Sequence, residues 1–391
     1  MSEQTPRDEE LEPVGPDCVV YSEEGEGPRT HVLIVGVGHY PYFIDGPRES
    51  PGAELSQLTS PSPSARALAN WFIDEYRYPP APLGSVALLV SEEIPTPFLT
   101  PSGARQLLDP DYNNFSVSVE HWFDRGNTDE NNRLIFMFCG HGYGFAQESS
   151  LLMSDFDFSR QARWDSALDL GKFVLGMAKC AAAEQLYFID ACRRPHGDLV
   201  SPGAVAGRTP IHVIADPRAN YQSKVNTPLF FATGNDEPAL SRANNVSIFT
   251  TAFLKAMRGM AARDDSGEWS VNNYSLLEAM AHISDRLTNE FFSNPQQPQG
   301  GQARAFVLHC LPKDPISPVY LYRDGGTPCG PGDLHYSVGG KPLSRSCTHD
   351  EIEIELELPF GKYDFTLVHN GSRIASVKQE ARPTWKRARL L

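Results

Sequence analysis

The sequence predicts an α/β fold, with a mostly parallel sheet flanked by helices and a small all-β domain after it. Between residues 30 and 310, apolar β-branched runs alternate with stretches whose apolar residues return at helical spacing. From about residue 312 the pattern changes to short alternating segments such as IEIELEL and YDFTLVH, separated by glycine-rich turns. We therefore expect a disordered acidic leader at 1–28, an α/β domain at 29–311 and a β-sandwich-like domain at 312–391.

Composition narrows the class of protein. The 391 residues are 40% hydrophobic and 21% charged, with a net charge of -15, as in an ordinary globular protein and unlike a nucleic-acid binder. No stretch approaches the roughly 18 apolar residues of a membrane helix, and the N-terminus lacks the features of a signal peptide. Seven cysteines show no C-x-x-C pair and no zinc spacing. We expect a cytoplasmic protein with no nucleic-acid or membrane partner, no metal and no cofactor.

The elements of the α/β part follow in order along the chain. HVLIVGV, VALLV, RLIFMFC and QLYFID are continuous apolar runs of the kind buried on both faces of a parallel sheet. Between them, helices are expected at 65–77, 115–123 and 167–183, the first capped by Ser64. After a long loop come a strand at 229–233, two helices and a strand at 304–310.

GVGHY, at 36–40, places a G-x-G after the first of these strands. It lacks the third glycine of a dinucleotide-binding turn, and a proline-rich loop follows where the helix should begin. A tight turn explains the glycines better than a nucleotide site does.

Two motifs end neighbouring strands with reactive side chains. FCGHGYG carries His141 between Gly140 and Gly142, and YFIDACRRP carries Cys192 where its apolar run stops. A packing cysteine would normally lie inside such a run, and glycines let other groups approach a histidine closely. Adjacent parallel strands are about 5 Å apart, so the thiol and the imidazole should meet as a nucleophile and its base.

The spacing of about 50 residues between this histidine and this cysteine is one that the caspase signature also shows. The region from 30 to 311 resembles the caspase-like cysteine peptidases. It resembles their metacaspase and bacterial members more than animal caspases, because DACRR has Asp190 where animal caspases have glutamine. The resemblance implies a caspase-like sheet.

For the site, the resemblance implies that His141 is the general base, Cys192 the nucleophile, and the N–H groups of Gly142 and Cys192 the oxyanion donors. It also implies that Asp190 lines a pocket for arginine or lysine, since positions 190 and 192 of a strand point to the same side. Asp236 matches a second pocket acid more loosely. An ion pair between Asp190 and Arg193 or Arg194 is the alternative, and Ser241 and Arg242 depart from the family pattern.

The loop after Cys192 offers further basic residues, among them Arg208, Arg218 and Lys224. Caspase-like proteins are often cut in this region, so we expect self-cleavage or cleavage by an activating protease or regulator between 193 and 228. Asp155 and Asp157 are the slight hint of calcium activation, and a solvated turn explains them equally well.

These observations predict a cysteine endopeptidase that cleaves protein substrates after arginine or lysine. The family alone suggests regulated proteolysis or antiviral defence. Two alternatives stay open: a catalytically silent caspase-like scaffold that binds partners, and a cysteine-dependent hydrolase or transferase acting on small molecules.

Overall fold

The computed structural model describes residues 12–100, 103–145, 148–159, 161–192, 207–211, 227–233, 244–264, 267–289, 296–300 and 304–391. The chain divides into two compact units. The first comprises Met1–Thr251 and Ser284–Arg304, and the second Ala252–Ile283 and Ala305–Leu391.

The longer elements of the α/β part are β2 (Thr30–Val37), α1 (Pro61–Asp74), β3 (Leu83–Ser91), α2 (Tyr112–Gly126), β6 (Arg133–Gly140), α3 (Leu170–Met177), β10 (Glu184–Ala191), α4 (Ile248–Lys255) and α5 (Asn273–Asn289). The shorter ones are β1 (Val19–Ser22), β4 (Phe98–Thr100), β5 (Gly103–Arg105), β7 (Gly142–Phe145), β8 (Glu148–Leu152), β9 (Ala167–Asp169), β11 (Leu229–Phe231), β12 (Ala262–Asp264), β13 (Trp269–Asn272), β14 (Gln299–Gly300) and β15 (Val307–Cys310).

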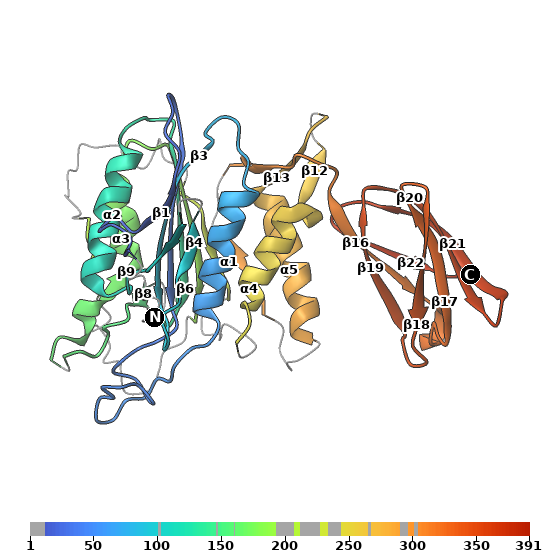
Figure 1. The fold of residues 1–391 in the computed structure, drawn as a ribbon, viewed down its shortest axis with the longest axis horizontal. Helices are drawn as coiled ribbons and strands as arrows, with labels where there is room; N and C mark the ends of the chain where they lie inside the picture. The colour runs from blue at the N-terminus through green and yellow to red at the C-terminus, as the bar shows by residue number, and fades with distance from the viewer. Residues whose placement is uncertain are drawn as a thin grey trace, which may run out of the picture. The chain divides into compact units, whose positions relative to one another are not determined.

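A mostly parallel sheet organises the first unit. Counted over the described segments it has seven strands in the order β1-β3-β2-β6-β10-β11-β14, and only the two edge pairings, β1 with β3 and β11 with β14, are antiparallel. Helix α1 lies on one face, and α2 and α3 lie on the other (Figure 1). This confirms the predicted fold class: an α/β sheet flanked by helices.

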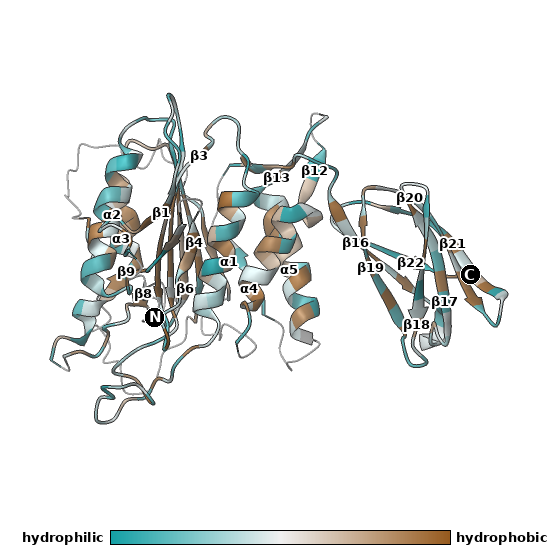
Figure 2. Cartoon of the chain, in the orientation of Figure 1, coloured by the Kyte–Doolittle hydropathy of each residue, from teal (hydrophilic) through white to brown (hydrophobic). Residues whose placement is uncertain are grey.

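The core follows from the apolar runs. Every residue of β2, β3 and β6 is buried, and these strands are among the most apolar segments of the ribbon (Figure 2). On one face Phe136 packs against Trp122 of α2 and Phe173 of α3. On the other face a Cβ at Gly36 would lie 2.6 Å from that of Ala65, so glycine lets α1 approach the sheet.

Four expectations about elements are wrong. Helix α1 begins at Pro61, after Ser60, so Ser64 lies inside the helix and does not cap it. The supposedly disordered leader contains β1, which pairs with β3 and buries Val20, because VVYS completes an otherwise open sheet edge. The helix expected at 167–183 is β9 followed by the short α3. The strand expected at 304–310 is only β15, which joins β13 in a separate sheet and not the central one.

The second unit contains a β-sandwich. Its strands are β16 (Ile316–Tyr322), β17 (Gly332–Val338), β18 (Lys341–Cys347), β19 (Glu353–Pro359), β20 (Gly361–His369), β21 (Ser372–Ala381) and β22 (Lys386–Arg389). They form the sheets β19-β16-β22 and β18-β17-β20-β21 around a core that includes Phe365 and Leu321.

Residues before position 312 also belong to this unit. The ring of His282 in α5 stacks on Trp385 at 4.4 Å, and Lys255 pairs with Glu357. Separate folding of 312–391 stays a prediction, since isolating it would uncover Trp385. In the part of the chain that is described, no helix has the length and apolarity needed to span a membrane.

Candidate active site

The register of the sheet brings His141 and Cys192 together. Strands β6 and β10 are parallel neighbours in which Asp190 pairs with Cys139 and Ala191 with Gly140. His141 is the first residue after β6, and Cys192 is the first residue after β10. Both therefore lie at the carboxyl edge of the sheet, after adjacent strands. Ligands of α/β sheets bind at this edge.

Hydrogen bonds and ring packing hold His141 in place. Its Nε2 lies 2.8 Å from the carbonyl oxygen of Ser56, and its main-chain N–H donates to the Tyr40 hydroxyl at 2.9 Å. Its ring packs against the rings of Tyr40 and Phe43, at 5.1 and 5.5 Å between centroids. Because a carbonyl only accepts, Nε2 carries the hydrogen, and the lone pair of the neutral imidazole is on Nδ1.

The two glycines beside His141 have different steric reasons. A Cβ at Gly142 would lie 2.7 Å from both the carbonyl oxygen of Cys192 and the Cβ of Ala191. A Cβ at Gly140 would lie 3.0 Å from the Tyr40 hydroxyl oxygen. Glycine at these positions therefore lets the two strand ends, and the tyrosine, approach one another.

Cys192 carries a half-buried thiol one residue beyond the end of β10. It lies close enough to Tyr40 to add to the raised pKa of that phenol, which burial alone already raises well above its ordinary value. The phenol is thus neutral, beside both the thiol and the imidazole. A thiol next to an imidazole in this way can act as a nucleophile with its base.

Asp190 is 7% exposed and points into the first unit. Its Oδ2 accepts hydrogen bonds from the hydroxyls of Ser247 and Thr250, the latter at 3.3 Å. Burial raises the pKa of the Asp190 carboxyl to about 6, although the two hydroxyls and the Cys139 thiol lower it. Its contacts in the described segments are with neutral groups.

Several predicted residues lie outside the described residues: Asp236, Arg218, Lys224, Arg193, Arg194, Ser241 and Arg242. Arg208 is described, and it is anchored. Its N–H donates to Ala167, its Nε donates to the carbonyl of Asp165 at 2.7 Å, and its guanidinium lies over the Tyr112 ring. A peptidase binds an extended, accessible segment, so this anchor must open before cleavage at Arg208.

Sequence reasoning missed four contributors to this region: Ser56, Tyr40, Ser247 and Thr250. Ser56 acts through a carbonyl that every residue has, so no sequence signal marks it. Ser247 begins α4 by accepting from the Thr250 N–H at 3.0 Å, and that helix-capping serine could have been found in the run SIFTTAF. Tyr40 ends the GVGHY motif, which we interpreted only as a turn.

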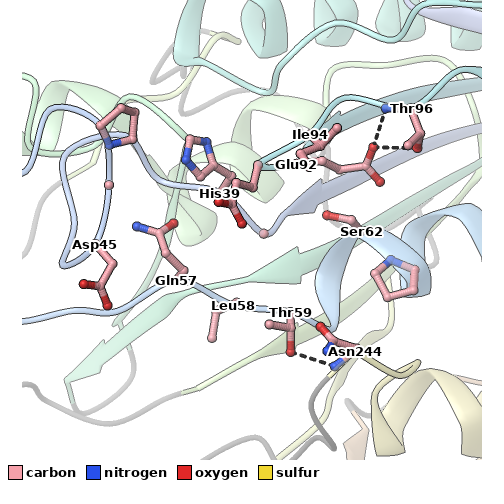
Figure 3. A pocket seen from close by; sticks show the side chains of 15 residues that line it. His39, Asp45, Gln57, Leu58, Thr59, Ser62, Glu92, Ile94, Thr96 and Asn244 are labelled. Carbon is pink, nitrogen blue, oxygen red and sulfur yellow. Dashed lines mark hydrogen bonds between the residues drawn. The ribbon is translucent and has the colours of Figure 1, made fainter.

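A cavity of about 730 Å³ opens over the ends of β2 and β3, and Gln57 is part of its lining. Figure 3 shows His39, Asp45, Gln57 and Glu92 around it. Among the described residues, its lining holds three carboxylates and no lysine or arginine. This charge disfavours a phosphate and supports the reading of GVGHY as a turn; in addition, a Cβ at Gly38 would lie 2.6 Å from Ser62 Oγ.

The carboxylates of Asp155 and Asp157 are engaged within the protein. Asp155 accepts from the Tyr112 N–H and the Ser166 hydroxyl, and Asp157 pairs with Arg163 at 3.1 Å. Over the residues that are described, no group of three or more His, Cys, Asp or Glu side chains is arranged to hold a metal ion.

Comparisons with known proteins identify a family and similar sequences and structures. The family model described as the caspase domain matches residues 29–307. An uncharacterized protein of Sinorhizobium fredii (strain NBRC 101917 / NGR234), y4kE, is 26% identical over 241 residues, which are 60% of this chain and 68% of that protein. The crystal structure of caspase-1 from Spodoptera frugiperda is 11% identical, covers 77% of this chain and 95% of its own, and has a TM-score of 0.42.

The fold and the family model together define a caspase-like peptidase domain. The chain belongs to the caspase-domain family. Membership supports proteolysis by a cysteine peptidase in general terms, with proteins as substrates.

Proposed function

We propose that this protein is a cysteine endopeptidase in which Cys192 and His141 form the catalytic dyad and which cleaves proteins after arginine or lysine. The observation that supports the proposal is the register of β6 and β10, which ends with Ala191 opposite Gly140, one residue before Cys192 and His141. The hydrogen bond from Nε2 to the Ser56 carbonyl supports the role of Nδ1 as the base.

In the first half of the reaction, Nδ1 of His141 takes the proton of the Cys192 thiol, and the thiolate attacks the scissile carbonyl carbon. The electron pair of the C=O bond moves to oxygen, which faces the N–H groups of Gly142 and Cys192. Such donors contribute on the order of 3 kcal/mol each in other hydrolases. As the C–N bond breaks, the imidazolium gives its proton to the leaving amine, and an acyl-enzyme remains.

In the second half, His141 removes a proton from water, and the hydroxide attacks the thioester. The C–S bond breaks, the thiolate leaves and is reprotonated by the imidazolium, and the new carboxylic acid departs and loses its proton to water. The Ser56 carbonyl stabilises each imidazolium that forms because it accepts the N–H of Nε2.

Asp190 is the proposed acid of the specificity pocket. A carboxyl whose pKa burial raises to about 6 gains from a cation that enters beside it, because the cation offsets the lost hydration. Ser247 and Thr250 would hold the carboxylate in place. Asp236 stays a looser candidate for the same pocket.

Activation by cleavage within 193–228, and a role in regulated proteolysis or defence, are proposals that rest on the family resemblance. A silent scaffold is the second candidate function. Retention of both His141 and Cys192 favours the peptidase, because a scaffold has no need of either.

The test uses the full chain beside Cys192→Ala with fluorogenic peptides ending in arginine, lysine, aspartate or leucine, and follows intact mass over time. Release after arginine or lysine that requires Cys192 is the expected result, with a mass change if the 193–228 loop is cut. Release after aspartate would retain the dyad and remove the role of Asp190. Wild type and variant alike in every assay would favour the scaffold.

A further inference from the structure

We propose that Tyr40 and Gln57 are positioning residues that hold His141 in its catalytic orientation. The inference rests on the proposed function and adds to it two residues that touch neither the scissile bond nor the nucleophile's proton. Its basis is a network of hydrogen bonds that joins three separate segments of the first unit.

The hydroxyl of Tyr40 stands at the centre of the network. It accepts the main-chain N–H of His141 at 2.9 Å and donates to the carbonyl of Leu152 at 3.3 Å. The N–H of Leu152 in turn donates to the His141 carbonyl at 3.0 Å. The main-chain N–H of His141 is thereby fixed by Tyr40, and its carbonyl is fixed by Leu152, which also accepts the Tyr40 hydroxyl.

Gln57 ties this tyrosine to the acceptor of the imidazole. Its Oε1 accepts the Tyr40 N–H at 2.7 Å, and its Nε2 donates to the carbonyls of Tyr40 at 2.9 Å and Ile44 at 3.0 Å. Gln57 follows Ser56, whose carbonyl receives Nε2 of His141. The Gln57 side chain therefore fixes the position of Tyr40 relative to Ser56, whose carbonyl accepts the hydrogen bond from the His141 ring.

Packing alone does not account for a tyrosine at position 40. A phenylalanine would preserve the stacked contact with Phe43, at 4.4 Å and 3° between planes, and the tilted ring contact with His141. What it would lose is a fully buried hydroxyl directed at the peptide N–H of His141. Gly140 leaves the space through which that hydroxyl reaches the strand end. The hydroxyl thus has a specific use.

The test compares Tyr40→Phe with Tyr187→Phe. Tyr187 is equally buried on β10 and also uses its hydroxyl, in a bond to Gln185 at 3.1 Å, but it does not contact His141. Tyr187→Phe loses one buried hydrogen bond of a hydroxyl and Tyr40→Phe loses two, at about 1 kcal/mol of stability for each bond. Thermal unfolding confirms that both are folded. Gln57→Leu, which removes the bonds to Tyr40 and leaves its ring, is the second test variant.

The first readout is alkylation of Cys192 by iodoacetamide across pH, followed by peptide mass mapping. In Tyr40→Phe and Gln57→Leu the rate at pH 6.5 should fall about 5- to 10-fold relative to the rate at pH 9, because a displaced imidazole no longer stabilises the thiolate. Tyr187→Phe should match wild type. The second readout is peptide cleavage, where kcat should fall about 10-fold with KM nearly unchanged.

The two proposals fail separately. If wild type cleaves peptides and Tyr40→Phe behaves like Tyr187→Phe in both alkylation and cleavage, the positioning role is wrong and the proposed peptidase activity is supported. If wild type cleaves nothing but the alkylation profile shifts only in Tyr40→Phe and Gln57→Leu, the positioning role stands and the peptidase does not.

Discussion

The two ends of the central sheet treat buried charge in opposite ways. At the amino end, Arg133 is fully buried and is paired: its Nε donates to Glu184 at 2.7 Å, and its guanidinium lies 3.5 Å from the centroid of the Tyr78 ring. At the carboxyl end, Asp190 is buried against the hydroxyls of Ser247 and Thr250 and the Cys139 thiol.

This difference separates stability from function. A buried ion that is already paired with its counter-ion does not attract a charged ligand. Removing its partner leaves an uncompensated buried charge. A buried carboxylate held only by neutral donors has a raised pKa and interacts favourably with an incoming cation. The amino end is therefore a structural end and the carboxyl end, with His141 and Cys192, is the candidate site. Substitutions at each end should separate in the same way.

The largest effect is expected from the dyad. Cys192→Ala and His141→Ala should each lower kcat/KM by at least about 1,000-fold, because the nucleophile or its base is removed. The melting temperature should change little. The matched control is Cys18→Ala, which removes a buried thiol near the start of the chain. It should keep full activity per folded molecule. Equal activity of Cys192→Ala and wild type would show that the carboxyl end of the sheet is not the catalytic site.

Next in size is the loss of the partner of Arg133. Glu184→Ala should lower the free energy of unfolding by about 3 to 5 kcal/mol, because Arg133 remains buried without its counter-ion. Peptidase activity of the folded fraction should persist. Lys172→Ala breaks the more exposed pair with Asp169 and should cost about 1 kcal/mol or less. Urea unfolding compares them, and a loss for Glu184→Ala as small as that for Lys172→Ala would contradict the structural role.

His31, also at the amino end, should make stability depend on pH. Its Nδ1 lies 2.9 Å from Ser85 Oγ, and burial, followed by the charges of Arg125 and Arg29, lowers its pKa to about 4 from 6.5. The unfolded chain binds the proton first as pH falls, so stability is present above pH 6.5 and is lost as pH falls from 6.5 to 4. The shift corresponds to about 3 kcal/mol. Urea unfolding of His31→Gln should lack this dependence, and an unchanged pH profile would show that His31 does not cause it.

Asp190 should give stability a pH dependence opposite in sign to that of His31. Its carboxyl has a pKa of about 6 in the folded chain, against an ordinary value of 3.8, so the folded state binds the proton more tightly than the unfolded chain does. Stability from this group is complete below pH 3.8 and is lost as pH rises through 6. Asp190→Asn should therefore be more stable than wild type at pH 7, by about 1 to 3 kcal/mol, with no difference below pH 4.

The same variant sharpens the functional side of the comparison. Cleavage after arginine by wild type should increase as pH rises through about 6, where the carboxylate ionises, and Asp190→Asn should lose its preference for basic residues. A variant less stable than wild type at pH 7 would mean that Asp190 already has a cationic partner at rest. That result would favour the alternative ion pair with Arg193 or Arg194.

Local patterns in the sequence identified the strands that carry the site. The apolar runs of β2, β3, β6 and β10 are buried, and an apolar run of that length is stable only inside a sheet covered on both faces. Since the runs of β6 and β10 stop one residue before His141 and Cys192, the position of these two residues at one edge of the sheet also followed. The sequence did not reveal β1, because a four-residue edge strand becomes favourable only when its partner is already in place.

The sequence by itself determined the α/β class, the two strand ends and the residues that stand on them, because those depend on periodicity and on the connection of parallel strands. Tertiary structure alone decided how His141 and Asp190 are held. Their partners, the Ser56 carbonyl, the Tyr40 hydroxyl and the Ser247 hydroxyl, lie 85, 101 and 57 positions away and belong to common groups that any segment can offer. Which carbonyl or hydroxyl arrives is fixed only when the loops pack against the edge of the sheet.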